Sequence, residues 1–160
     1  FYLIVTDAEN QGGPAGMAIY NGITFNFAPR MPDSYVYSTL GHEILHHWIG
    51  GGDISISKST ADFYWILEGL TDYLGLRLAF ESGVISQGEY FDALNRKIVE
   101  NETSIFKSVT NQDMRDYYPT NQMISTIPYC RHHLIFYYLD NFYSKNGSLK
   151  DSLSLKWLKK

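Results

Sequence analysis

The sequence predicts an α+β domain, because strand-like patterns occupy its beginning and helical patterns fill the rest. Residues 1–28 are the β-rich part, and residues 32–160 carry apolar side chains at helical spacing. Strands that precede helices, rather than alternate with them, favour this class over a parallel α/β sheet. With 160 residues, 44% of them hydrophobic and 19% charged, the chain has the length and composition of one globular domain. We expect a short N-terminal sheet followed by a helical bundle.

The β-rich part has two stretches of strand character. Residues 2–5 form a short run rich in β-branched and aromatic side chains. Residues 17–27 alternate loosely around Asn21-Gly22, which either turns a tight hairpin or marks a bulge within one long strand. Pro29 then ends the strand pattern, since proline cannot donate to a ladder.

The first helix is expected directly after the strands. Asp33 or Ser34 offers its N-cap, and apolar residues recur at helical spacing as far as Trp48. Three glycines at 50–52 are expected to end it, because successive glycines hold helical geometry poorly.

The later helices are predicted from their end signals. Thr60 is an expected cap for the second helix, Gly83 closes it, and Ser86 with Glu89 forms a capping box for the third. The stretch 101–126 is polar and irregular in pattern. The expected helices cover about residues 62–80, 86–99 and 129–143, with a last one after a cap at Ser148.

Charge and cysteine content exclude several classes of protein. The chain has 13 Lys and Arg against 17 Asp and Glu, a net charge of −4, which argues against binding to nucleic acid or to an anionic membrane surface. No apolar run approaches the ~20 residues of a membrane-spanning helix. Cys130 is the single cysteine, so neither a disulfide framework nor a cysteine-based zinc site is expected. The sequence predicts no compartment and no oligomeric state.

The first predicted helix contains the pattern H-E-x-x-H, in His42, Glu43 and His46. Residues four apart lie one turn apart on one helical face, so both imidazoles can reach a single zinc ion. Glu43 projects beside that face, where it can take a proton from a zinc-bound water. A helix with two surface histidines near a glutamate remains the alternative.

The second predicted helix supplies a candidate third ligand, Glu68. An unpaired carboxylate in so apolar a stretch would be costly, and a metal explains its presence. Asp72 lies one turn further on, where it can accept the outer N–H of a ligating histidine. An exposed glutamate and an ordinary surface aspartate are the alternatives. His47 points away from the expected ligand face.

These residues resemble the gluzincin metallopeptidases, and within them most closely the glycyl aminopeptidase family, which is related to the aminopeptidase N and leukotriene A4 hydrolase group. The resemblance rests on His42-Glu43-x-x-His46-x-Trp48 followed by Trp65-x-x-Glu68-Gly69-x-x-x-Tyr73.

The resemblance implies a thermolysin-like catalytic domain that binds Zn²⁺. It implies His42, His46 and Glu68 as the zinc ligands and Glu43 as the general base. It also implies an oxyanion-stabilising tyrosine on a later helix, at the position of Tyr129. Because members of the family carry more sheet and further domains, residues 1–160 are expected to be a single catalytic domain out of a larger protein.

Besides its smaller sheet and the absence of further domains, the chain is expected to depart from the family at two motifs. The family has a Gly-Gly-x-Glu-His motif above the cleft, whose glutamate can hold the substrate's amino terminus. This chain has Gly12-Gly13-Pro14-Ala15-Gly16 instead, and Glu9 is a candidate substitute. The glycine that usually follows the oxyanion tyrosine is replaced around His132-His133, which either donate to an oxyanion or are polar residues at a helix start.

The sequence thus predicts zinc-dependent hydrolysis of a peptide or protein substrate, aminopeptidase-like, with a zinc-activated water and Glu43 as the base. One alternative is a non-catalytic module that keeps the metallopeptidase fold to bind peptides or proteins. Another is zinc-dependent hydrolysis of a non-peptide bond, for which the zinc site would be the same.

Overall fold

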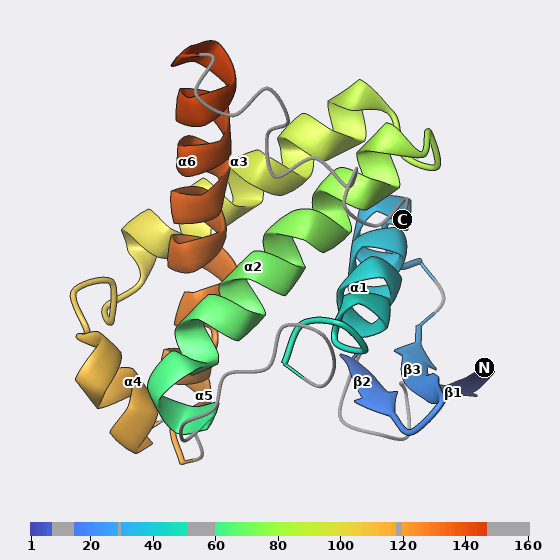
Figure 1. Ribbon diagram of the computed structural model, residues 1–160, viewed down its shortest axis with the longest axis horizontal. Helices are drawn as coiled ribbons and strands as arrows, with labels where there is room; N and C mark the ends of the chain where they lie inside the picture. The colour runs from blue at the N-terminus through green and yellow to red at the C-terminus, as the bar shows by residue number, and fades with distance from the viewer. Residues whose placement is uncertain (8–14, 29, 51–59, 118–119, 147–160) are drawn as a thin grey trace.

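The computed structural model describes residues 1–7, 15–28, 30–50, 60–117 and 120–146, and shows a small sheet beside a body of helices (Figure 1). This confirms the α+β class. The elements are β1 (Tyr2–Asp7), β2 (Ala15–Ile19), β3 (Gly22–Phe27), α1 (Asp33–Leu45), α2 (Thr60–Glu81), α3 (Gln87–Thr103), α4 (Asn111–Tyr117), α5 (Gln122–Ser125), the π-helix η2 (Pro128–His132) and α6 (His133–Asn146).

The sheet has the order β1-β3-β2, with β1 parallel and β2 antiparallel to β3. Ile19 pairs with Gly22, so the hairpin alternative is the correct one. Its two turn residues are Tyr20 and Asn21, one position earlier than Asn21-Gly22, and Asn21 takes the left-handed φ of 56°. Gly22 is instead the first residue of β3. A side chain does not fit at this position, because a Cβ would lie 2.5 Å from the carbonyl oxygen of Tyr2.

Both ends of α1 differ from the prediction. The N-cap is Pro32, and Asp33 is already helical. Ser34 is buried, and its hydroxyl accepts a hydrogen bond from Arg96 of α3 instead of capping the helix. The helix ends at Leu45, well before the glycines, and a turn over residues 46–48 leads to Gly50, whose φ is +95°.

The end signals around α3 are confirmed. Gly83 has a φ of +76°, and the Ser86 and Glu89 side chains form the predicted capping box. The helix runs on to Thr103, past the predicted end. Thr60 is already the first residue of α2, not the residue that caps it, so that prediction was wrong. The predicted cap at Ser148 lies outside the described residues.

The polar stretch after α3 is more regular than predicted. Thr110 and Asp113 exchange hydrogen bonds at the start of α4, and the Asn121 side chain caps α5. The helix predicted over 129–143 is in fact two elements, because the chain winds through the π-helix η2 before α6 begins.

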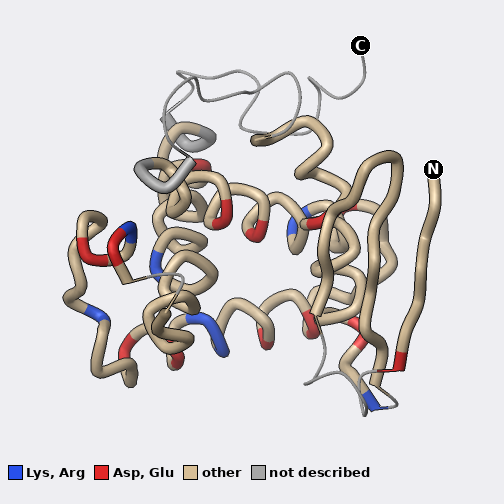
Figure 2. Tube along the Cα trace, turned by 90° about the horizontal axis from the view of Figure 1, so that it is seen from below, with Lys and Arg blue, Asp and Glu red and all other residues tan. Residues whose placement is uncertain are grey.

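Helix α2 runs through the middle of the helical body and packs against α1, η2 and α6 (Figure 1). The strands stand at one side of the helices, and basic and acidic positions are interspersed along the trace (Figure 2). A core cluster joins the end of α1 to α2, with Leu45, Ile49, Leu67, Tyr73 and Leu74 as its buried members. Among the described helices, none combines the length and the hydropathy needed to cross a bilayer.

Glycines set how closely α1 and α2 approach. A Cβ on Gly75 of α2 would lie 2.6 Å from the backbone oxygen of Ser38 and 2.7 Å from the backbone nitrogen of His42. Gly41 faces Gly75 from the other helix, where a Cβ would lie 3.1 Å from the Gly75 oxygen. The two backbones therefore touch beside His42, and this close crossing fixes the distance from His42 to the side chains of α2.

Candidate metal centre

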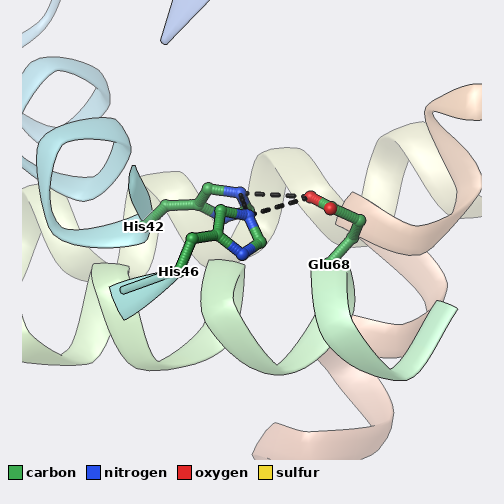
Figure 3. Close-up of side chains that lie close together, drawn as sticks. All are labelled: His42, His46 and Glu68. Atoms are coloured by element: carbon green, nitrogen blue, oxygen red, sulfur yellow. Dashed lines mark hydrogen bonds and ion pairs between the residues drawn. The ribbon is translucent and has the colours of Figure 1, made fainter. Parts of the chain in front are cut away.

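His42 and His46 come from the last turn and the C-cap of α1, and both rings point toward α2 (Figure 3). Their Nε2 atoms are 2.9 Å apart. The i, i+4 spacing on a helix produces this arrangement directly. The other ring nitrogen of His46 also has a partner, since its Nδ1 lies 3.3 Å from the carbonyl oxygen of Ile49 in the turn that follows the helix.

Glu68 of α2 completes the group. Its Oε2 atom lies 3.1 Å from Nε2 of His42 and 3.5 Å from Nε2 of His46 (Figure 3). The residue is 8% exposed. Burial would raise the pKa of Glu68, but hydrogen bonds and charge from the two histidines outweigh burial and lower it to about 2. The carboxylate is thus held ionised at the point where both imidazoles converge.

The donor atoms of this cluster fit a zinc ion. Two imidazole nitrogens and a carboxylate oxygen are a ligand set that Zn²⁺ takes, at about 2.0–2.2 Å each. Ligands of a tetrahedral ion at those lengths lie ~3.4 Å apart, and the three separations here are 2.9, 3.1 and 3.5 Å. All three residues therefore form a compact group that could hold a metal ion.

Glu43 is buried beside this cluster, under the strand β2. Its carboxylate accepts a hydrogen bond from the backbone of Ala18. A Cβ on Gly16 would lie 2.6 Å from Cγ and 2.9 Å from Oε1 of Glu43, so only glycine lets β2 pass this close. Burial raises the pKa of Glu43, although the neighbouring histidines oppose the rise. A carboxylate with a raised pKa is a stronger base.

Tyr129 of η2 reaches the same cluster from a third element. Its hydroxyl donates a 2.8 Å hydrogen bond to Oε2 of Glu68, and its ring centroid lies 5.7 Å from that of His42. Tyr129 belongs to the π-helix η2, which packs against α2. The structure therefore brings together five of the residues that the sequence singles out, namely His42, Glu43, His46, Glu68 and Tyr129.

Asp72 lies one turn below Glu68, and its Oδ2 atom has two partners. Nδ1 of His133 is 2.6 Å away and Nζ of Lys97 is 2.5 Å away. Burial would raise the pKa of Asp72, but Lys97 and His133 outweigh burial and hold it well below its usual range. Nδ1 of His42 is buried and, within the described part of the chain, has no hydrogen-bond partner. Asp72 as a partner of a ligating histidine stays a prediction.

The structure gives the other histidines separate surroundings. Nε2 of His47 lies 3.1 Å from the carbonyl oxygen of Gly22 and joins the end of α1 to the sheet. His132 is buried against the ring of Trp65, at a centroid distance of 4.8 Å. His133 is fully buried at Asp72.

Sequence reasoning missed Lys97. Besides Asp72, its ammonium donates to the carbonyl oxygen of Tyr129 at 2.9 Å, so it joins α3 both to α2 and to η2. In the sequence it is one polar residue on an amphipathic helix, and its place at the site depends on how α3 packs.

A cavity of about 420 Å³ opens beside the cluster, between α1 and α3. Its wall includes His42, Glu43 and Tyr129 together with residues of α3. The candidate catalytic residues are therefore next to a space that a substrate side chain can fill.

Comparison with known proteins identifies the family. The family model of the M61 glycyl aminopeptidases matches residues 35–139, which is 105 of the 160 residues. No curated protein matches the sequence significantly. The matched range contains the His42, His46 and Glu68 cluster together with Glu43 and Tyr129. The chain therefore belongs to the M61 glycyl aminopeptidase family.

Proposed function

We propose that this protein is a zinc metallopeptidase that hydrolyses peptide bonds, in the manner of an aminopeptidase. The observation that carries the proposal is the convergence of His42, His46 and Glu68 in a buried cluster on α1 and α2. Membership of a peptidase family supports peptides as the substrate class.

His42, His46 and Glu68 would hold the ion. Zinc bound there would supply a Lewis acid that polarises the substrate carbonyl and lowers the pKa of a water molecule. Asp72 would orient His42 by accepting the proton of Nδ1, the buried nitrogen that has no partner within the described residues. These four side chains come from α1 and α2, so the crossing of the two helices positions all of them.

Glu43 would act as the general base. It is fixed by the N–H of Ala18 and lies beside the histidines without belonging to their cluster. It would take a proton from the attacking water and then pass that proton to the nitrogen of the leaving amine. This two-step transfer needs no other titratable group at the reacting bond.

Tyr129 would stabilise the oxyanion that forms at the substrate carbonyl. Its hydroxyl already lies at the cluster, on Oε2 of Glu68. A phenol there can donate a hydrogen bond to a developing negative charge. Electrostatic stabilisation of this kind is usually the largest single contribution to catalysis. The alternative donors, His132 and His133, are buried against other groups, Trp65 and Asp72 respectively.

The proposal predicts that Glu43→Gln keeps zinc and loses peptide hydrolysis. The amide has nearly the shape of the carboxylate but cannot accept the proton, so we expect kcat to fall at least 100-fold. The measurements are zinc content by atomic absorption and cleavage of a mixed peptide library. Glu102→Gln, on the exposed part of α3, is the matched control and should leave both values unchanged.

Two outcomes would contradict the proposal. Full turnover by Glu43→Gln would exclude Glu43 as the base. Stoichiometric zinc in the wild-type protein with no cleavage of any peptide would favour the non-catalytic binding module instead.

A further inference from the structure

We propose that the cavity between α1 and α3 is a substrate subsite in which Arg96 binds a carboxylate next to the scissile bond. The inference rests on the proposed peptidase function and names a preference within it. The substrates would be peptides with Asp or Glu at the position that enters this cavity.

The position of the cavity makes it a subsite. Its wall is continuous with the catalytic cluster, because His42, Glu43 and Tyr129 all line it. A side chain next to the bond that Glu43 attacks would therefore have the cavity directly beside it. The volume of about 420 Å³ leaves room for a Glu side chain with solvent around it.

The lining of the cavity is polar where α1 meets α3. Four hydroxyl residues of α1 line it, namely Ser34, Tyr35, Ser38 and Thr39. Ser34 already accepts a hydrogen bond from Arg96, and Ser38 donates one to the carbonyl oxygen of Tyr35, so these hydroxyls make the wall polar and hold its side chains in place. A carboxylate can accept hydrogen bonds from hydroxyls and from a guanidinium at the same time.

Arg96 and Lys97 are the two cations that line the cavity, and only one of them has its charge matched by a neighbour. Lys97 is paired with Asp72 at 2.5 Å. Arg96 donates one hydrogen bond, from Nη2 to the neutral hydroxyl of Ser34 at 3.1 Å. Among the described residues no carboxylate lies within ion-pair distance of Arg96. Because a guanidinium has five N–H donors, Arg96 retains donors for a substrate carboxylate.

Acidic side chains of the wall would repel a substrate carboxylate and so oppose its binding by Arg96. Asp72 is matched by Lys97 and His133, and Glu43 serves the reaction. Glu100 also lines the cavity, one turn along α3 from Arg96, and is exposed. Glu100 would weaken the attraction of Arg96 for an acidic substrate, so its removal should strengthen the preference.

The test compares isosteric peptide pairs, with Glu against Gln and Asp against Asn, placed in turn on either side of the scissile bond. We expect the wild-type zinc enzyme to show a higher kcat/KM for the acidic member at one position. Arg96 is exposed, so solvent screens its attraction for a carboxylate, and Arg96→Met should reduce that Glu/Gln ratio by roughly 2- to 5-fold. Glu100→Gln should raise the ratio.

Controls separate a specific role from a general change in charge. Lys107→Met removes a cation from an exposed site outside the cavity and should leave the ratio unchanged. Arg96→Glu should reverse the preference, so that Lys is favoured over Glu, and it keeps the proposal testable if Arg96→Met folds poorly. Dipeptides with a free or an amidated C-terminus show whether the carboxylate comes from a side chain or from the chain end.

The outcomes distinguish this inference from the proposed function. An unchanged Glu/Gln ratio in both Arg96 variants, with active enzyme, would overturn the subsite and leave the peptidase intact. If the wild-type protein cleaves no peptide, the peptidase proposal fails, and the subsite is tested by calorimetric binding of the same Glu and Gln peptides to the zinc-loaded protein. Equal binding of the two peptides there would overturn the subsite as well.

Discussion

The adjacent histidines His132 of η2 and His133 of α6 have different surroundings. His133 is buried at the carboxylate of Asp72, so its Nδ1 has a charged partner. His132 points the other way, against Trp65, and its Nδ1 is buried without a hydrogen-bond partner among the described residues. A Cβ on Gly69 would lie 2.4 Å from Cβ of His132, so η2 packs directly onto α2 at this point. Burial with no charged partner favours the neutral form of His132.

The surroundings of His132 predict a loss of stability in mild acid. Burial, and then the charge of Arg131, lower the pKa of His132 to about 4, against about 6.5 in an unfolded chain. Above pH 6.5 the histidine is neutral in both states. Between pH 6.5 and 4 the unfolded chain binds a proton that the folded chain does not, so the free energy of unfolding falls, by about 2–3 kcal/mol at pH 4.5. Denaturant titrations at pH 7 and 4.5 measure the fall.

His132→Leu is the matched variant for this test, because it fills a similar volume and does not titrate. Its free energy of unfolding should depend less on pH than that of the wild-type protein, by about 2–3 kcal/mol over the same interval. Equal pH dependence in the two proteins would show that His132 is not the group responsible.

At the residue scale, the sequence predicts those site residues that share one helix turn or one motif. His42, Glu43 and His46 are predicted from their spacing on a helix. Glu68 is predicted because an unpaired carboxylate in an apolar stretch would be energetically costly. Lys97 and Arg96 could not be predicted, because they reach the site only through the packing of α3 against α1 and α2. The sequence also could not separate His132 from His133, because their surroundings differ by tertiary contacts alone.

At the element scale, the crossing of α1 and α2 determines the geometry of the cluster. The ends of α1 differ from the prediction: the helix ends at Leu45 and its following residues turn to pack into the core, whereas the glycines come later. The ends of α2 lie within two residues of those predicted. The π-helical turn at Tyr129 was likewise not predicted, since no local signal distinguishes it from an α-helix. The capping box at Ser86 and Glu89 was predicted correctly, because it is a local interaction.

The contact at Gly75 predicts that a single methyl group disturbs this crossing. In Gly75→Ala, Cβ would lie 2.6 and 2.7 Å from backbone atoms of α1 that cannot rotate away, so the helices must separate. We expect a loss of about 1–3 kcal/mol in the free energy of unfolding and weaker zinc binding, because His42 moves from Glu68. Thermal unfolding and zinc titration measure the two effects.

Gly88→Ala is the matched control, since the same change at the start of α3 meets only Oγ of Ser86, at 3.9 Å. It should be neutral or stabilise the helix by up to about 1 kcal/mol. If Gly75→Ala kept both the stability and the zinc affinity of the wild-type protein, the close helix contact would not be what positions His42.

At the scale of the whole molecule, the metal cluster lies where three parts of the helical body meet. His42 and His46 end α1, Glu68 belongs to the central helix α2, and Tyr129 of η2 is bonded to Glu68. A zinc ion held by the first three would therefore join helices whose contacts otherwise depend on a small core and a glycine crossing. Because such an ion binds the folded chain and not the unfolded one, its binding free energy adds to the stability of the fold.

Zinc should therefore raise the melting temperature, and the rise should depend on Glu68. At a free zinc concentration 100 times Kd the added stability is about 2.7 kcal/mol, which for a domain of this size corresponds to a rise of roughly 5–10 °C. Calorimetry of the chelator-treated protein, with and without zinc, gives the rise. Glu68→Ala removes one of the three ligands and should abolish most of it, whereas Glu102→Ala, an exposed acidic residue outside the cluster, should preserve it. An equal rise in Glu68→Ala would mean that zinc stabilises the protein from another site, and the ligand set on α1 and α2 would have to be abandoned.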